Sequence, residues 1–143
     1  MEIRNKISAA DFYKMRKSVK WKEVSLEQLE KALSNSMNVI GIYEENEIVA
    51  MGRIVGDYTF KGMLTDIIVK PECQKKGYGK IVVTKLLENV KAGLKHSEKI
   101  EIQGSPTAGN RNFYVNCGLE YEPEEQDGVY IWIEQDNSQI KEV

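Results

Sequence analysis

The stretch Asp66-Ile-Ile-Val-Lys-Pro-Glu-Cys-Gln-Lys-Lys-Gly-Tyr-Gly-Lys80 joins a strand pattern to a helix pattern through a basic loop with two glycines. The apolar residues 63–69 predict a strand, and Pro71 ends it because proline cannot donate to a β-ladder. After the loop, apolar residues recur at helical spacing from Lys80 to Leu94. The sequence therefore predicts a strand, a glycine loop and a helix in direct succession.

The loop 74–80 has the features of a phosphate-binding loop. The first turn of a helix leaves backbone N–H groups unpaired, at the positive end of the helix dipole. Gly77 and Gly79 lack a Cβ, so an anionic oxygen can approach the backbone closely. An ordinary strand-to-helix turn with solvated lysines is the alternative. Three lysines add positive charge to the loop: Lys75, Lys76 and Lys80.

Two common phosphate loops do not match this stretch. A Walker A loop continues Gly-Lys with Ser or Thr, but Gly79-Lys80 is followed by Ile81. A dinucleotide-binding loop has a third glycine three residues after the second, and that position is Val82. A nucleotide-phosphate binder is therefore a weaker interpretation of the loop.

The loop instead resembles the acetyl-CoA loop of the GNAT superfamily of N-acetyltransferases, Gln/Arg-x-x-Gly-x-Gly/Ala, with Gln74, Gly77 and Gly79. The lead-in Ile67-x-Val69-x-Pro71-Glu72 is similar to that of the family. The resemblance implies an α+β fold in α/β/α layers, with a mixed, mostly antiparallel sheet and about four helices. In that fold, two parallel central strands splay apart and acetyl-CoA lies in the gap.

The resemblance also implies which residues hold acetyl-CoA. The family's bulged fourth strand offers a backbone N–H to the thioester carbonyl, here around Ile67, Ile68 and Val69. The loop and the start of the helix supply the remaining contacts: Gln74, Lys75, Lys76, Gly77, Tyr78, Gly79 and Lys80.

A second stretch, Phe113-Tyr114-x-x-x-Gly118-Leu119, resembles the C-terminal GNAT signature, with Leu119 in place of a common Phe. The resemblance implies that Tyr114 lies beside the CoA sulfur and protonates the leaving thiolate as general acid. A tyrosine that only closes a small core is the alternative.

The positions upstream of Tyr114 depart from the family. Where the family often has Asn and Ala, this chain has Thr107 and Asn110. We expect Asn110, or else Asn112, to replace the side-chain contact with CoA that the family's Asn makes.

The sequence identifies the general base less clearly than the general acid. An attacking amine must be neutral, so a carboxylate can assist by taking its proton, directly or through water. Asp66 lies in the expected central strand, while Glu101 and Gln103 lie on its expected parallel neighbour. We predict Asp66 as the base, with a structural role as hydrogen-bond acceptor as the alternative.

The remaining elements follow from capping and periodicity. Ser8 with Asp11, and Ser25 with Gln28, are capping signals for two N-terminal helices. Trp21, between them, is expected to be a core aromatic rather than the wall of a substrate site. The other expected elements are strands 2–7, 38–43 and 47–55, the last two as a hairpin, strand 99–103 parallel to strand 63–69, helix 110–116 and strand 129–134.

Composition agrees with a single domain over residues 1–143. The net charge of −2 gives no reason to expect nucleic acid. Cys73 and Cys117, with one histidine, are too few for a disulfide framework or a metal site. The sequence has no apolar signal core and no apolar run that could span a membrane, so we expect a cytoplasmic protein.

These features predict an enzyme that transfers an acetyl group from acetyl-CoA directly to the primary amine of a small molecule. The alternatives are an acetyltransferase for peptide or protein amines, or a non-catalytic acyl-CoA-binding regulatory module of the same fold. The mild negative charge weakly favours a cationic amine. Many members of the superfamily form homodimers, but the sequence identifies no interface.

Overall fold

The computed structural model describes residues 1–106, 110–121 and 128–135. Its centre is a seven-stranded sheet with the order β1-β2-β3-β4-β5-β7-β6. The strands are β1 (Glu2–Arg4), β2 (Asn38–Glu44), β3 (Glu47–Gly56), β4 (Lys61–Val69), β5 (Lys99–Gly104), β6 (Glu120–Tyr121) and β7 (Val129–Glu134). The helices are α1 (Ala9–Ser18), α2 (Leu26–Ser34), α3 (Tyr78–Gly93) and α4 (Arg111–Asn116), with a short 3-10 turn at Pro71–Cys73.

The two N-terminal helices begin at the predicted caps. The Ser8 hydroxyl accepts a hydrogen bond from the Asp11 backbone N–H at 3.0 Å, and the Ser25 hydroxyl accepts one from that of Gln28 at 3.2 Å. The predicted hairpin is also confirmed. Its turn residues Glu45 and Asn46 have φ values of 49° and 66°, as the tight turn between two twisted strands requires.

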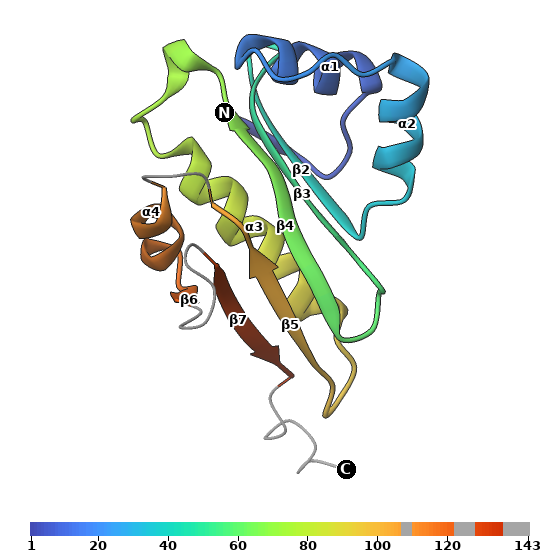
Figure 1. Ribbon diagram of the computed structural model, residues 1–143, viewed down its shortest axis with the longest axis vertical. Helices are drawn as coiled ribbons and strands as arrows, with labels where there is room; N and C mark the ends of the chain where they lie inside the picture. Colours follow the sequence, from blue (N-terminus) through green and yellow to red (C-terminus); the bar gives the residue numbers. More distant parts are fainter. Residues whose placement is uncertain (107–109, 122–127, 136–143) are drawn as a thin grey trace.

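The helices cover the two faces of the sheet unequally (Figure 1). The helices α1 and α2 lie together over one face at one end of β2, β3 and β4, whereas α3 runs along the opposite face. Phe12 and Met15 of α1 are fully buried against the first face, and Val83 and Leu86 of α3 against the second. The sheet therefore separates two apolar cores.

The strands β4 and β5 are parallel, and they pair only over Lys61–Leu64 and Glu101–Gly104. After Leu64 they separate, and within the described ranges no strand pairs with 65–69 of β4 on that side (Figure 1). The mixed sheet and the short parallel pairing confirm the predicted α+β fold with splayed central strands. The short strand β6, which pairs with β7, was not expected.

The free part of β4 contains a β-bulge. The pairing with β3 shifts between Met51 and Arg53, so that two residues of β4, Asp66 and Ile67, lie opposite Gly52. Asp66 has a φ of 52°, which is uncommon for a residue other than glycine. The bulge leaves one residue of β4 outside the ladder and turns its backbone toward the gap between the strands.

Among the helices of the described ranges, none is both long and apolar enough to cross a lipid bilayer.

Candidate active site

A cleft of about 700 Å³ opens beside the free part of β4. Its walls come from β4, the glycine loop, the first turn of α3, and α4. The cleft brings the two sequence motifs together, although 32 residues separate them along the chain. The lining side chains predicted to contact acetyl-CoA are Ile67, Val69, Gln74, Lys75, Gly77, Tyr78, Gly79, Lys80 and Asn110, and Tyr114 lines the same cleft.

Two of the predicted cofactor residues do not line this cleft. Ile68 is 2% exposed, and its side chain packs into the core on the α1 and α2 face, with Phe12 and Met15. Only its backbone remains available to a ligand in the gap. Lys76 is exposed and lies outside the cleft lining. Thr107, the position of the family's usual Asn, lies outside the described residues.

The start of α3 is open to an anion. Gly77 is its N-cap with φ of 87°, and no side chain caps this end among the residues described. The first helical hydrogen bond runs from the Ile81 N–H to the Gly77 carbonyl, at 3.2 Å. The N–H groups of Tyr78, Gly79 and Lys80 therefore precede the first intrahelical donor, at the positive end of the helix dipole.

The two loop positions require glycine for different physical reasons. Gly77 adopts a left-handed conformation, and a Cβ there would have open space around it. A Cβ on Gly79 would lie 3.1 Å from Cζ of Phe113. Gly79 thus allows α4 to pack closely over the start of α3, which places Tyr114 beside the cleft.

Gly77→Ala is expected to destabilise the fold by about 1–2 kcal/mol, because an L-residue is strained at positive φ. It should also weaken CoA binding, since the loop must change to relieve the strain. Gly93→Ala is the matched control, because Gly93 ends the same helix, has no positive φ and leaves open space for a Cβ. Urea denaturation and calorimetric titration with CoA measure both effects. Equal behaviour of the two variants would contradict the role given to Gly77.

Tyr114 is held by the packing of α4. Its ring meets the Phe113 ring edge-on, with 5.0 Å between the centroids. Burial raises the pKa of Tyr114 to about 12, with a smaller contribution from Cys117. The phenol is therefore protonated at neutral pH, as a proton donor must be. Burial also raises the pKa of the Cys117 thiol, against the opposing charge of Lys80.

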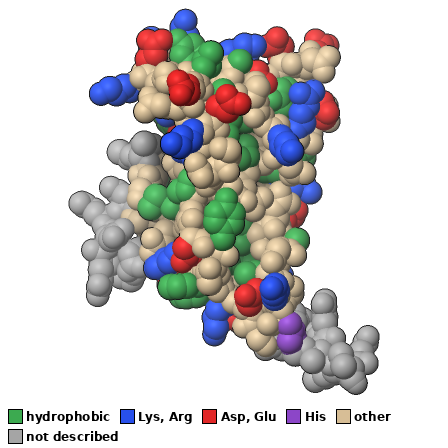
Figure 2. All heavy atoms as spheres, turned by 90° about the vertical axis from the view of Figure 1, so that its right-hand side faces the viewer, with side chains coloured by type: hydrophobic (Ala, Val, Ile, Leu, Met, Phe, Trp, Pro, Cys, Tyr) green, Lys and Arg blue, Asp and Glu red, His purple; other side chains and the backbone are tan. Residues whose placement is uncertain are grey.

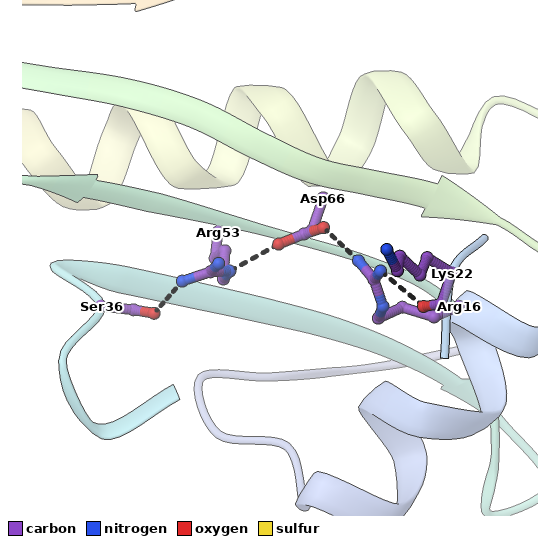
Figure 3. A network of polar contacts seen from close by, with 5 residues as sticks. All are labelled: Arg16, Lys22, Ser36, Arg53 and Asp66. Atoms are coloured by element: carbon purple, nitrogen blue, oxygen red, sulfur yellow. Dashed lines mark hydrogen bonds and ion pairs between the residues drawn. The ribbon is translucent and has the colours of Figure 1, made fainter. Parts of the chain in front are cut away.

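Asp66 lies in an ion-pair network on the other face of β4 (Figure 3). One carboxylate oxygen is 2.7 Å from Nε of Arg53, and the other is 3.3 Å from a terminal nitrogen of Arg16. Arg53 also donates to the Ser36 hydroxyl at 3.1 Å, and Arg16 to the Lys22 carbonyl at 2.9 Å. Both oxygens already accept from guanidinium groups, which favours the structural alternative. The role of Asp66 as base stays a prediction.

The two polar residues noted on the parallel neighbour, Glu101 and Gln103, lie in the paired part of β5. Glu101 is paired with Lys61 and accepts a hydrogen bond from the Gln103 amide at 3.3 Å. It precedes Gly104, where the strand ends, by three residues, or about 10 Å of strand. Neither Glu101 nor Gln103 is among the residues that line the cleft.

Sequence reasoning missed a second cavity, next to Trp21. The expectation of a core aromatic is wrong, because Trp21 is 41% exposed. It lines a pocket of about 360 Å³ between the end of α1 and the start of α2, called here the α1–α2 pocket. A tryptophan among basic residues in a connection between helices was the available signal for it.

Comparison with known proteins agrees with this geometry. A sequence model described as "Acetyltransferase (GNAT) family" matches residues 6–119. This chain belongs to the GNAT family of acetyltransferases. The GNAT match includes the glycine loop, the splayed strands and Tyr114.

Three similar proteins illustrate the GNAT relationship. The chain is 30% identical over 87 residues to GCN5-related N-acetyltransferase 2, chloroplastic, of Arabidopsis thaliana, which covers 61% of this chain and 32% of that protein. The present chain therefore spans about a third of the length of this Arabidopsis relative. A probable acetyltransferase of unknown function from methicillin-resistant Staphylococcus aureus has a TM-score of 0.74 and 21% identity, over 88% of this chain and 92% of the other. PaiA N-acetyltransferase from Thermoplasma acidophilum, solved in complex with coenzyme A, has a TM-score of 0.64 and 16% identity, over 94% and 99% of the two chains.

Proposed function

We propose that this GNAT protein transfers the acetyl group of acetyl-CoA directly to the primary amine of a small molecule. The observation that carries the proposal is the cleft itself. It combines the open N-terminus of α3, the bulged free edge of β4 and the protonated Tyr114 in one cavity.

The cleft supplies a suitable place for each part of acetyl-CoA. The N–H groups at the start of α3, with Lys75 and Lys80, suit the pyrophosphate. The free edge of β4 offers backbone groups to the extended arm, next to the apolar side chains of Ile67 and Val69. A structural neighbour solved with coenzyme A supports this assignment.

The chemistry then needs one polarised carbonyl and two proton transfers. A backbone N–H in the bulge, at Ile67 to Val69, would stabilise the negative charge on the thioester oxygen as the amine nitrogen attacks the carbonyl carbon. When the C–S bond breaks, the Tyr114 hydroxyl protonates the departing sulfur. The surplus proton of the amine leaves to solvent, or to Asp66 if that residue acts as base.

The pH dependence follows from the pKa of Tyr114. Since that pKa is raised to about 12, the acid stays protonated throughout the range in which amines lose their protons. We expect kcat/KM to rise with pH as the acceptor becomes neutral, and not to fall before about pH 11. A decline near pH 9 in a still-folded protein, checked by circular dichroism, would contradict Tyr114 as acid.

Calorimetric titration with acetyl-CoA, CoA and ATP, side by side, tests the proposed function. Micromolar binding of acetyl-CoA, about −8 kcal/mol, without binding of ATP is the expected result. Thiol release in the presence of an amine then separates an enzyme from a regulatory module that only binds acyl-CoA. Absence of binding by both CoA species would overturn the proposal.

A further inference from the structure

The α1–α2 pocket differs in charge from the surface around it. Basic and acidic side chains are mixed over the part of the molecule formed by α1 and α2 (Figure 2). Within the pocket, four of the eight lining residues are basic and one is acidic. The lining consists of Tyr13, Arg16, Lys17, Lys20, Trp21, Lys22, Glu23 and Val24.

The acidic residues near the pocket do not neutralise it. Glu23 accepts a hydrogen bond from the Tyr13 hydroxyl. Asp66, behind the pocket, is shared between Arg16 and Arg53, so two guanidinium groups face a single carboxylate. Nε of Arg16 is also buried and finds no hydrogen-bond partner within the described parts of the chain. An anion would therefore meet a net positive charge.

The chain builds this pocket through an unusual end to α1. Lys20 has a φ of 60° where glycine would be favoured. Its N–H donates to the Lys17 carbonyl at 3.0 Å, and the Trp21 N–H donates to the Arg16 carbonyl at 3.1 Å. This turn sets the Trp21 ring 5.5 Å from the Arg16 guanidinium. A strained lysine thus places a cation and an aromatic ring on the same pocket.

The pocket also lies next to the reaction site. Arg16 lines the pocket and contacts Asp66, and the next residue along β4, Ile67, lines the cleft. Because β5 separates from β4 after Leu64, residues 65–69 border the gap between the two strands. The side of the sheet with the pocket and the side with the cleft therefore meet at this edge of β4. The Arg16 side chain and Asp66 therefore connect the pocket directly to the bulge of β4.

From these observations, and resting on the proposed function, we infer that the acceptor is a small amine that also carries an anionic group. The carboxylate or phosphate would lie among Arg16, Lys17, Lys20 and Lys22, and an apolar part would lie against Trp21. This reverses the weak expectation of a cationic amine from the net charge, because the local field differs from the total charge.

The test uses two matched pairs of amines, phenylalanine with phenethylamine and phosphoethanolamine with ethanolamine. The fluorescence of Trp21 reports binding in a Trp132→Phe variant, since the chain has two tryptophans. We expect the anionic member of at least one pair to change the signal at an at least tenfold lower concentration, about the effect of two exposed charge pairs. The advantage should shrink as salt is raised. The pair with the larger advantage tells carboxylate from phosphate.

Lys20→Gln removes one pocket charge and should reduce the advantage of the anionic amine about three- to fivefold. Lys20→Gly removes the same charge and also relieves the strain of the positive φ. A similar reduction of the anionic advantage in this variant therefore cannot come from a destabilised fold. Lys31→Gln, on α2 and outside the pocket lining, is the control and should leave the advantage unchanged. Equal responses to both members of each pair, or none to any amine, would overturn the inference.

Titration of the same preparations with acetyl-CoA separates the two proposals. Suppose that acetyl-CoA binds, and that the neutral amines are bound and acetylated with the same efficiency as the anionic amines. Then the proposed function holds, and only the inference of an anionic acceptor is wrong. If acetyl-CoA fails to bind while the anionic amines still bind at Trp21, the proposed function fails and the anion pocket stands.

Discussion

Tyr114→Phe is expected to lower kcat by about 10²- to 10⁴-fold, the usual contribution of a positioned general acid. The substitution keeps the aromatic ring, so the edge-on contact with Phe113 and the packing of α4 should be retained. Without the hydroxyl, the sulfur must leave as an unprotonated thiolate. Thiol release at saturating acetyl-CoA and amine measures the effect.

The affinity for acetyl-CoA separates a chemical role of Tyr114 from a structural one. The calorimetric Kd should change by less than about threefold, because the ring still lines the cleft. Tyr121→Phe is a matched control, since the Tyr121 hydroxyl donates to Asn112 on α4 at 2.7 Å and Tyr121 is not a cleft-lining residue. A Tyr114→Phe protein with full activity would remove the general acid from the mechanism and favour a tyrosine that closes a core.

Asp66→Ala is expected to destabilise the protein by about 3–5 kcal/mol, as is usual when one partner of a buried ion pair is removed. The side chains of Arg16, Arg53 and Asp66 are 18%, 16% and 9% exposed, so both guanidinium groups would lose a partner that water replaces poorly. Alanine is also strained at the φ of 52°. Urea denaturation gives the change in the free energy of unfolding.

Two further variants show which property of Asp66 matters. Glu134→Gln removes an exposed carboxylate, 3.9 Å from Lys99, and should change stability by less than about 1 kcal/mol. Asp66→Asn keeps an acceptor oxygen and tolerates positive φ, so it isolates the charge. If Asp66 is the base, kcat of Asp66→Asn should fall strongly at neutral pH and recover as the pH is raised, because the amine then loses its proton to solvent. A stable Asp66→Asn protein with unchanged kcat would exclude that role.

Local rules account for most of the predicted fold. Pro71, the loop glycines and the apolar spacing after Lys80 act over a few residues, so the strand, the loop and α3 could be predicted from the sequence. The caps at Ser8 and Ser25 are equally local. Both motifs of the cleft consist of such segments, and family resemblance supplied their relative position.

Other features depend on contacts or backbone angles that leave little trace in the sequence. Lys20 adopts positive φ without being glycine, and this turns Trp21 out of the core. The bulge at Asp66 decides which face Ile68 occupies. Arg16 reaches Asp66 across 50 positions of the chain, so only the folded structure reveals that the carboxylate predicted as general base is held by two arginines.

Because β4 and β5 pair over a short length, the stability of the folded protein depends on which molecule binds in the gap between them. Four residue pairs join these strands, and beyond them no described strand pairs with this edge of β4. A molecule that fills this gap in the folded state and cannot bind the unfolded chain stabilises the fold by mass action, by about 2.7 kcal/mol at one hundred times its Kd. If that molecule is acetyl-CoA or CoA, the lifetime of this protein against proteolysis would follow the cellular pool of these two molecules, so the chain would persist longest where its cosubstrate is plentiful.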